Sequence, residues 1–371
     1  MADWTKPFEA SYRFMRVGRA SGFEEEELGG IIGGTLEVNQ DTAVYESATL
    51  QTVEYFDLGS DLVRGYLDAT WEDGTTESVC LGTWLASVPA RDVDGPLDSC
   101  TAYCDGRLQE LQDDSFPAPV AVDAGENIVE MAKAVAVWAG LNVVSTPSDS
   151  TLSTMWTFGL DSEGDDEGGS KLQAVNSLLE LAGYSSAYTD ELGNVVMKPY
   201  VDPSYRNPVW TFQEGVNATF LSRGKEERDS REVCNVVLAI YESDEQTFIG
   251  EAVDDDPMSP YSTDPQTGIG RRKVAKYRYD SLPQGSTDQE RQASADAKAE
   301  ELLRTQQATI RRVTVQHVHC PVKVGDVVEV RWPSAKIEGT YVVRTQTVDL
   351  GSAGCLTQSE LRAFERRRNA E

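Results

Sequence analysis

The stretch SKLQAVNSLLELAGYSSAYTDELGNVVMKP, Ser170 to Pro199, places one helix directly before one hairpin. Ser170 and Gln173 fit a capping box, the leucines and valine that follow recur at helical spacing, and Gly183 is suited to end the helix. Two strand-like segments, Ser185–Thr189 and Asn194–Pro199, then flank the turn formers Asp-Glu-Leu-Gly. The stretch therefore predicts an α+β unit.

The residues upstream of this stretch extend the α+β pattern. Apolar residues from Glu126 to Ala139 follow helical spacing, and Gly140 can cap the end. We therefore predict one α+β domain over residues 99–208.

The segment before it, residues 1–98, is predicted to be a β-barrel-like domain. Its turn signals include Asp73-Gly74, which sits between two alternating segments and indicates a hairpin. Several short strands in about 90 residues favour a small barrel or sandwich. The expected strands are Thr35–Val38, Thr52–Phe56, Leu62–Ala69 and Ser78–Leu85.

Residues 209–350 are predicted to form a second β-barrel-like domain with an inserted helix over residues 287–308. Thr287 and Glu290 fit a capping box at the start of that helix. Residues 351–371 are expected to be a C-terminal tail, either a short helix or a frayed end. The predicted fold class is α+β, mainly β, with two small β-barrel-like domains flanking an α+β domain.

The charge is strongly acidic and unevenly distributed. The net charge is −29; residues 1–98 carry 19 acids and 6 bases, residues 99–208 carry 17 and 5, and residues 209–371 carry 26 and 22. This balance argues against a surface that grips nucleic acid, because phosphate binding needs a basic footprint. Solubility or an acidic host proteome is the alternative reading of the same charge.

Neither a membrane segment nor a disulfide framework is expected. The N-terminus has no apolar core of a signal peptide, and the longest apolar-rich stretch is interrupted by Lys133 and too short to span a bilayer. The six cysteines are irregularly spaced, which favours synthesis in a reducing cytoplasm.

Motifs for catalysis are missing from the sequence. It has no Walker-type loop, no dinucleotide fingerprint and no Gly-x-Ser-x-Gly elbow, and it holds only two histidines. We therefore expect no catalytic residues and no cofactor.

The strongest metal candidate is the segment QHVHC, Gln316 to Cys320. On a strand, His317 and His319 would point to one face and Cys320 to the other. Cys100 and Cys104, if the fold brings them near, would complete a zinc site. Ordinary strand side chains are the preferred interpretation, so we expect no metal.

A series of segments in the last part of the chain resembles the hub protein of phage tails. Residues 102–142 and 171–200 are also similar to that family's middle domain, so the resemblance covers about two-thirds of the chain. In chain order, the segments are KPYVDPSYRNPVWTF, EVCNVVLAIYES, DDDPMSPYSTDPQTGIGRR, YRYDS, ADAKAEELLRTQQA, RRVTVQHVHCP, VGDVVEVRWP and GTYVVRTQTVDLG, between Lys198 and Gly351.

This resemblance implies a structural virion protein made in the host cytoplasm. It implies a homotrimer whose two barrels per subunit form a pseudo-sixfold ring that adapts a sixfold tail tube to a threefold tip. Implied partners are the distal tail or tail-tube ring, the tape-measure protein and a tip fibre or receptor-binding protein. DNA would pass through a central channel in transit, without membrane insertion.

Two other function classes remain open from the sequence. One is a cell-wall hydrolase that uses acid pairs, or a metal near His317 and His319. The other is an oligomeric scaffold outside phages.

Overall fold

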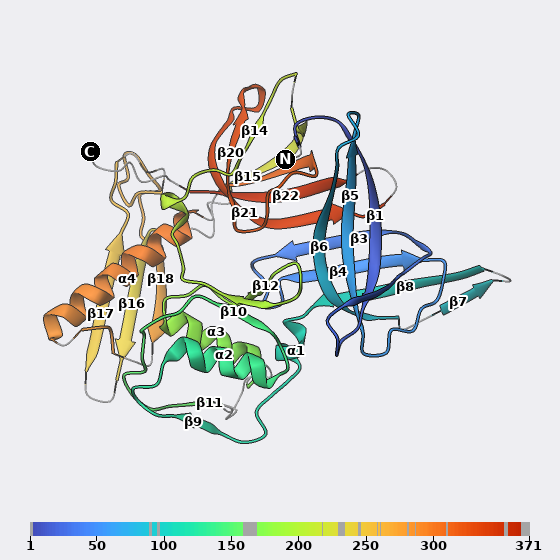
Figure 1. Cartoon of the computed structure of the whole chain (residues 1–371). Helices are drawn as coiled ribbons and strands as arrows, with labels where there is room; N and C mark the ends of the chain where they lie inside the picture. Colours follow the sequence, from blue (N-terminus) through green and yellow to red (C-terminus); the bar gives the residue numbers. More distant parts are fainter. Residues whose placement is uncertain are drawn as a thin grey trace.

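Strands dominate the computed structural model, which confirms the α+β, mainly β prediction (Figure 1). Figure 1 shows the N-terminal strands on one side, the C-terminal strands above, helices α1 to α3 below, and α4 with its own strands on the opposite side. The structure describes residues 3–88, 91–94, 97–158, 169–216, 218–228, 234–243, 246–257, 259, 261–279, 282–285, 287–308, 311–351 and 355–364.

The N-terminal β region contains the Asp73-Gly74 hairpin that the sequence predicts. Strands β5 and β6 pair antiparallel around it, and Gly74 has a φ of 81° in the turn. The strands of the region are β1 (Phe8–Val17), β2 (Glu24–Glu27), β3 (Ile31–Asn39), β4 (Glu46–Thr52), β5 (Leu62–Trp71), β6 (Thr76–Ser87), β7 (Arg91–Asp94) and β8 (Leu97–Gly106).

The C-terminal β region shares a sheet with the N-terminal one. Strand β21 pairs antiparallel with β3, from Thr345 opposite Asn39 to Asp349 opposite Thr35. The described strands of the two β regions thus form one 14-stranded sheet, in which β15 and β2 are the two edge strands of the continuous order. Its C-terminal strands are β14 (Trp210–Gln213), β15 (Phe220–Arg228), β19 (Arg311–Val318), β20 (Val327–Trp332), β21 (Ile337–Asp349) and β22 (Leu356–Ala363).

The middle region packs two helices over small sheets. The Ser170 side chain accepts from the Gln173 amide, as the sequence predicts, and the Asn127 side chain accepts from the Glu130 amide at the start of the other helix. Their buried faces form one apolar core with β13. The elements are α1 (Gln109–Gln112), β9 (Val120–Val122), α2 (Ile128–Trp138), β10 (Val143–Ser145), β11 (Trp156–Phe158), α3 (Lys171–Leu181), β12 (Tyr188–Thr189) and β13 (Val195–Met197).

The inserted layer is a three-stranded sheet crossed by one long helix. Thr287 and Glu290 form the predicted reciprocal capping box, with N···O distances of 3.1 and 3.2 Å. The helix lies so close to β17 that a Cβ on Gly250 would stand 2.0 Å from the Ala295 carbonyl oxygen. The elements are β16 (Val236–Glu242), β17 (Thr247–Val253), β18 (Val274–Tyr279) and α4 (Asp288–Ala308).

Two local predictions are wrong. The strand expected at Thr52–Phe56 lies earlier, because β4 ends at Thr52, where the Thr52 hydroxyl donates to the Glu54 carbonyl. The expected C-terminal tail, residues 351–371, contains strand β22, which lies between β19 and β21 and whose Leu361 is fully buried. Residues 365–371 lie outside the described residues. None of the described helices combines the length and apolarity needed to cross a membrane.

Candidate functional site

The β12–β13 hairpin reaches out of the middle region and touches both β regions. Its turn is held by Asp190, whose carboxylate accepts from the amides of Leu192 and Asn194 at 3.0 and 2.8 Å. Gly193 closes the turn with a φ of 81°, a conformation that glycine adopts without strain. We call the contacts of residues 188–193 with both β regions the hairpin joint.

The turn backbone provides most of the hairpin joint. The Glu191 carbonyl accepts from the Thr83 hydroxyl at 2.8 Å and from the Cys80 thiol at 3.4 Å. Arg107 donates to the Gly193 carbonyl at 3.5 Å. On the C-terminal side, Lys323 forms an ion pair with the Glu191 carboxylate. One turn is therefore bonded to residues from both ends of the chain: Cys80 and Thr83 on β6, and Lys323 in the connection between β19 and β20.

Glu46 is the buried acid of the hairpin joint. Its side chain, from β4, accepts from Trp84 Nε1 at 3.2 Å and from the Thr189 hydroxyl at 3.1 Å. Burial raises the pKa of Glu46 to about 8, helped by the negative charges of Glu191 and Asp190 and opposed by the two hydrogen bonds. Next to it, the rings of Tyr45 and Tyr188 stack 6.4 Å apart. Two adjacent residue pairs thus connect β12 with the start of β4 and the residue before it.

Trp84 fixes the position of the Glu46 carboxyl. The indole is fully buried, and Gly65 and Gly82 make room for it, because a Cβ on either would lie 2.7 Å from the ring. Any side chain at these glycines would displace the indole and with it the Nε1 donor.

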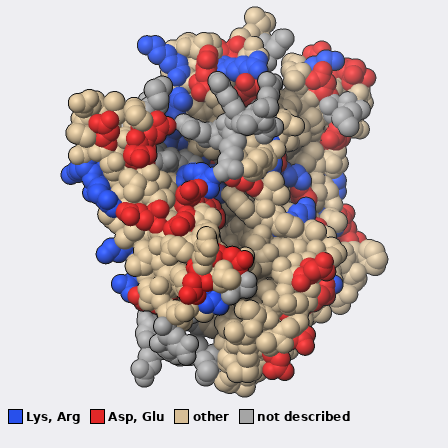
Figure 2. Space-filling model, turned by 90° about the vertical axis from the view of Figure 1, so that its left-hand side faces the viewer, with Lys and Arg blue, Asp and Glu red and all other residues tan. Residues whose placement is uncertain are grey.

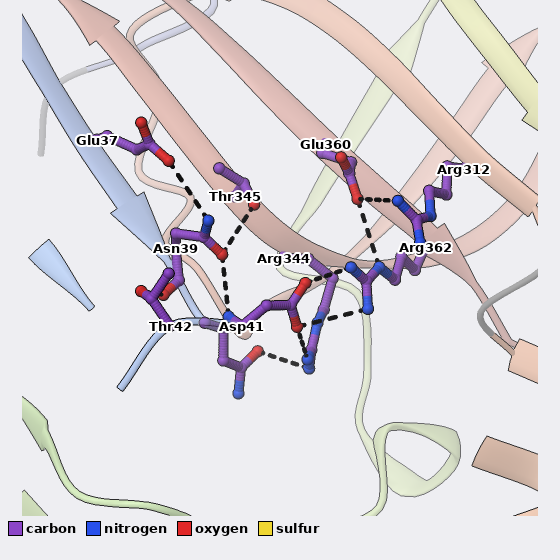
Figure 3. Close-up of polar contacts among 10 residues, drawn as sticks. Glu37, Asn39, Asp41, Thr42, Arg312, Arg344, Thr345, Glu360 and Arg362 are labelled. Atoms are coloured by element: carbon purple, nitrogen blue, oxygen red, sulfur yellow. Dashed lines mark hydrogen bonds and ion pairs between the residues drawn. The ribbon is translucent and has the colours of Figure 1, made fainter. Parts of the chain in front are cut away.

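A second contact, which we call the Asp41 clamp, links the β3–β4 connection to the C-terminal strands (Figure 3). Asp41 forms ion pairs with Arg344 of β21 and Arg362 of β22, and Arg344 also donates to the Gln40 amide oxygen at 2.9 Å. Glu360 continues the network, accepting from Arg362 at 3.4 Å. The clamp lies at the end of the β3–β21 pairing and adds ion pairs to the backbone hydrogen bonds there.

The connection before the clamp is held by its own side chains. The Asn39 side-chain oxygen accepts from the Asp41 amide at 2.9 Å, and Thr42 donates to the Asn39 carbonyl at 2.8 Å. Burial opposes ionisation of Asp41, but the hydrogen bonds and charges of Arg344 and Arg362 outweigh it and hold the pKa of Asp41 below its usual value. The clamp carboxylate is therefore ionised at neutral pH.

The four metal candidates lie in different surroundings. The His317 ring accepts from or donates to Ser359 Oγ at 2.8 Å and contacts the Val318 carbonyl oxygen at 2.7 Å. A carbonyl only accepts, so Nδ1 carries the proton and Nε2 accepts from Ser359. Burial lowers the pKa of His317 to about 4, which keeps the ring neutral. Both ring nitrogens are occupied, by the Val318 carbonyl and the Ser359 hydroxyl.

The predicted alternation of this segment is wrong. Strand β19 ends at Val318, so the two-residue period stops there. His317 and Cys320 consequently meet, with Nδ1 and Sγ 3.5 Å apart, while the His319 ring packs on Trp4 at 5.0 Å.

Cys100 and Cys104 lie on β8 in the N-terminal region, both buried, and Cys104 packs in the core around Trp84. Within the part of the chain that the structure describes, no three His, Cys, Asp or Glu residues gather in a way that could hold a metal ion.

A groove of about 620 Å³ crosses the face of the joined sheet. Its lining side chains are mainly short and neutral, and none of the lining residues is a lysine or an arginine. They are Ile32, Gly33, Gly34, Thr35, Thr49, Gln51, Gln316, Thr347, Asp349, Gly351, Leu356, Thr357 and Gln358. The groove follows the β3–β21 pairing, so it exists only because the two β regions share a sheet.

The residues of the hairpin joint and of the Asp41 clamp were not predicted from the sequence. One signal was available for Glu46: β4 alternates strictly, and Glu46 stands on the same face as Ala48 and Leu50, where an acid is unusual. No local signal pairs Asp41 with Arg344 and Arg362, because that contact depends on long-range strand register.

Comparisons with solved structures agree on the fold of the whole chain. A tail protein from Neisseria meningitidis MC58 superposes with a TM-score of 0.66 at 15% identity, covering 95% of this chain and 96% of that one. The 43 kDa tail protein of prophage MuSo2 from Shewanella oneidensis has a TM-score of 0.64 at 10% identity, covering 95% and 98%.

A chain of the Francisella PdpA–VgrG complex has a TM-score of 0.56 at 7% identity, covering 98% of this chain and 60% of that one. No protein-family model matches the sequence, and no curated protein matches it. The fold is thus one found in phage tail proteins, and it extends over nearly the entire chain.

Proposed function

We propose, from a fold found in phage tail proteins, that this protein is a structural component of a phage tail, the trimeric hub at the tail tip or baseplate. The observation that carries the proposal is the agreement over 95% of the chain with two tail proteins of nearly equal length. In this role the hub adapts a sixfold tail tube to a threefold tip and lines a channel for DNA and the tape-measure protein.

The two joints support a role that depends on rigid geometry. In such a ring, the two β regions of each subunit occupy the positions of two subunits of the sixfold tube. This arrangement requires a fixed angle between the two regions. The shared sheet, the hairpin joint and the Asp41 clamp each bond the N-terminal β region to the C-terminal one. We also propose a division into three units close to the predicted 1–98, 99–208 and 209–350, with β8 kept whole in the first unit and β22 included in the last.

The charges fit a passage that does not hold DNA. Residues 1–208 carry most of the net charge of −29, and a negative wall repels phosphates. Figure 2, which faces the side of the inserted layer, displays acidic and basic side chains interspersed. Such mixed surfaces suit specific protein contacts, so we propose that the neighbouring tail proteins bind to the C-terminal half of the chain.

We further propose that the protein has no enzymatic activity of its own. His317 is buried and neutral and is engaged by Ser359, which suits packing and not proton transfer. Any cell-wall cleavage or receptor binding at the tip would then belong to a docked partner, a fibre or receptor-binding protein.

Mass photometry and negative-stain imaging of the purified protein test the assembly. The expected result is a ring with the mass of three copies, alone or after mixing with the adjacent tail-tube and tape-measure proteins. A strictly monomeric species under both conditions would overturn the hub proposal.

A further inference from the structure

Glu46 is a buried acid whose hydrogen-bond donors, Trp84 and Thr189, are neutral; a neutral acceptor could accept the same two hydrogen bonds. Its side chain is only 8% exposed and lies between β6 and β12, two strands of different regions. Among the described residues, no lysine or arginine forms an ion pair with it, whereas buried acids are ordinarily paired.

The groups facing Glu46 from each side are either neutral or negative. Trp84 of β6 and Thr189 of β12 donate hydrogen bonds, and Asp190 and Glu191 of the turn add negative charge. The nearby cations of the joint have their own carboxylates: Arg107 pairs with Glu110, and Lys323 pairs with Glu191. Arg64, beyond Thr83, pairs with Glu24.

We propose that Glu46 is a protonation-controlled latch that holds the β12–β13 hairpin against the N-terminal β region when neutral and releases it when ionised. In the neutral form one carboxyl oxygen still accepts from Trp84 Nε1, while the protonated oxygen donates to the Thr189 hydroxyl and no longer accepts from it. In the ionised form an unpaired charge is buried beside two other negative charges, and release of the hairpin lets water reach it.

The direction of the pH effect follows from linkage. The ordinary pKa of a glutamate is 4.5, and burial at the joint raises the pKa of Glu46 to about 8. The docked state therefore binds more protons than the released state across this interval, so docking is strongest below pH 4.5 and weakens as pH rises through 8. The equilibrium constant for release rises about tenfold per pH unit within the interval.

The latch is independent of the proposed assembly, because every contact it uses lies within one chain. The contacts of the turn backbone with Thr83 and Arg107 do not involve Glu46, so they define where the hairpin docks. The protonation state of Glu46 changes only the fraction of molecules in which the hairpin is released.

Hydrogen exchange of the full-length protein, read by mass spectrometry on peptides covering residues 185–199, tests the latch. Protection factors, corrected for intrinsic exchange, are measured from about pH 5 to pH 9. The wild type is expected to lose protection about tenfold per pH unit up to about pH 8, and E46Q is expected to keep constant protection. The matched control E9Q removes an exposed glutamate from β1 of the same sheet and should follow the wild type.

Wild-type protection that does not change with pH, or an equal slope in E46Q, would overturn the latch. If E46Q does not fold, E191Q decides instead: removing a charge that raises the pKa of Glu46 should shift the wild-type transition to lower pH. An unchanged midpoint in E191Q would overturn the proposal as well.

Discussion

Asp41 and Glu46 flank the same strand connection, yet their surroundings act on them in opposite directions. Asp41 is partly exposed and faces two guanidinium groups, which hold its pKa below the usual value. Glu46 is buried without an ion-pair partner among the described residues, and its pKa rises to about 8. The sign of a joint's pH response is thus determined by what faces the carboxyl group.

The two joints also differ in the kind of bond they use. The hairpin joint depends on backbone carbonyls of a tight turn, which need shape complementarity. The Asp41 clamp depends on side-chain charges, which need low ionic screening. Steric changes, or ionisation of the buried Glu46, should therefore break the first joint, whereas loss of surface charge or added salt should break the second.

The largest effect is expected for Gly193→Ala. The new methyl group would lie 2.7 Å from Arg107 Cδ and 3.3 Å from Thr83 Cβ, in a backbone conformation that disfavours alanine. Strain and overpacking together should lower the free energy of unfolding by about 2–3 kcal/mol. Chemical denaturation of the purified variant measures this loss.

Gly74→Ala is the matched control for this variant. Gly74 has the same φ of 81°, but a Cβ there meets no atom within 4 Å. Its cost should be about 1 kcal/mol, from the backbone alone. Equal costs at the two glycines would mean that the turn does not pack against the N-terminal β region.

The next largest effect is expected for Asp41→Asn. Loss of the carboxylate leaves Arg344 without an ion-pair partner among the described residues and leaves Arg362 with Glu360 alone, which should lower stability by about 1–2 kcal/mol. The loss should shrink in about 1 M salt, because screening weakens the wild-type pairs. Thermal melting at low and high salt measures both effects.

The exposed pair of Arg331 and Glu329 provides the control for the clamp. Glu329→Gln should change stability by less than about 0.5 kcal/mol at either salt concentration. A clamp variant that behaves like this control would show that Asp41 contributes no more than a surface charge.

The local parts of this fold were predictable, and the joints were not. Capping residues such as Ser170 and Thr287, and the Asp73-Gly74 turn, act over a few neighbouring positions, so the sequence alone predicts their elements. The β3–β21 pairing joins Asn39 to Thr345, and no local pattern specifies which distant strand completes a sheet. Strand β22 was missed for the same reason, since its burial comes from the two strands beside it.

Lowering the pH should weaken the contact made by Asp41 and strengthen the contact made by Glu46, because the pKa of the first carboxyl is lowered and that of the second is raised. The lowered pKa of Asp41 means that its contribution is present above the ordinary value of 3.8 and is lost as pH falls through its folded value. The difference in stability between the wild type and Asp41→Asn should therefore narrow as pH falls below about 4. Denaturation curves at pH 3 and pH 7 measure this change; a difference that stays constant would contradict the ion-pair assignment.

The smallest effect is expected for Lys323→Ala, which removes the charged contact of the hairpin joint. Lys323 is 70% exposed and Glu191 is 36% exposed, so solvent screens the pair. Its loss should cost about 0.5 kcal/mol, well below the cost of Gly193→Ala, while exchange of the hairpin amides stays close to the wild type. A loss as large as that of Gly193→Ala would instead mean that the hairpin is held mainly by charge, and the distinction between the two joints would disappear.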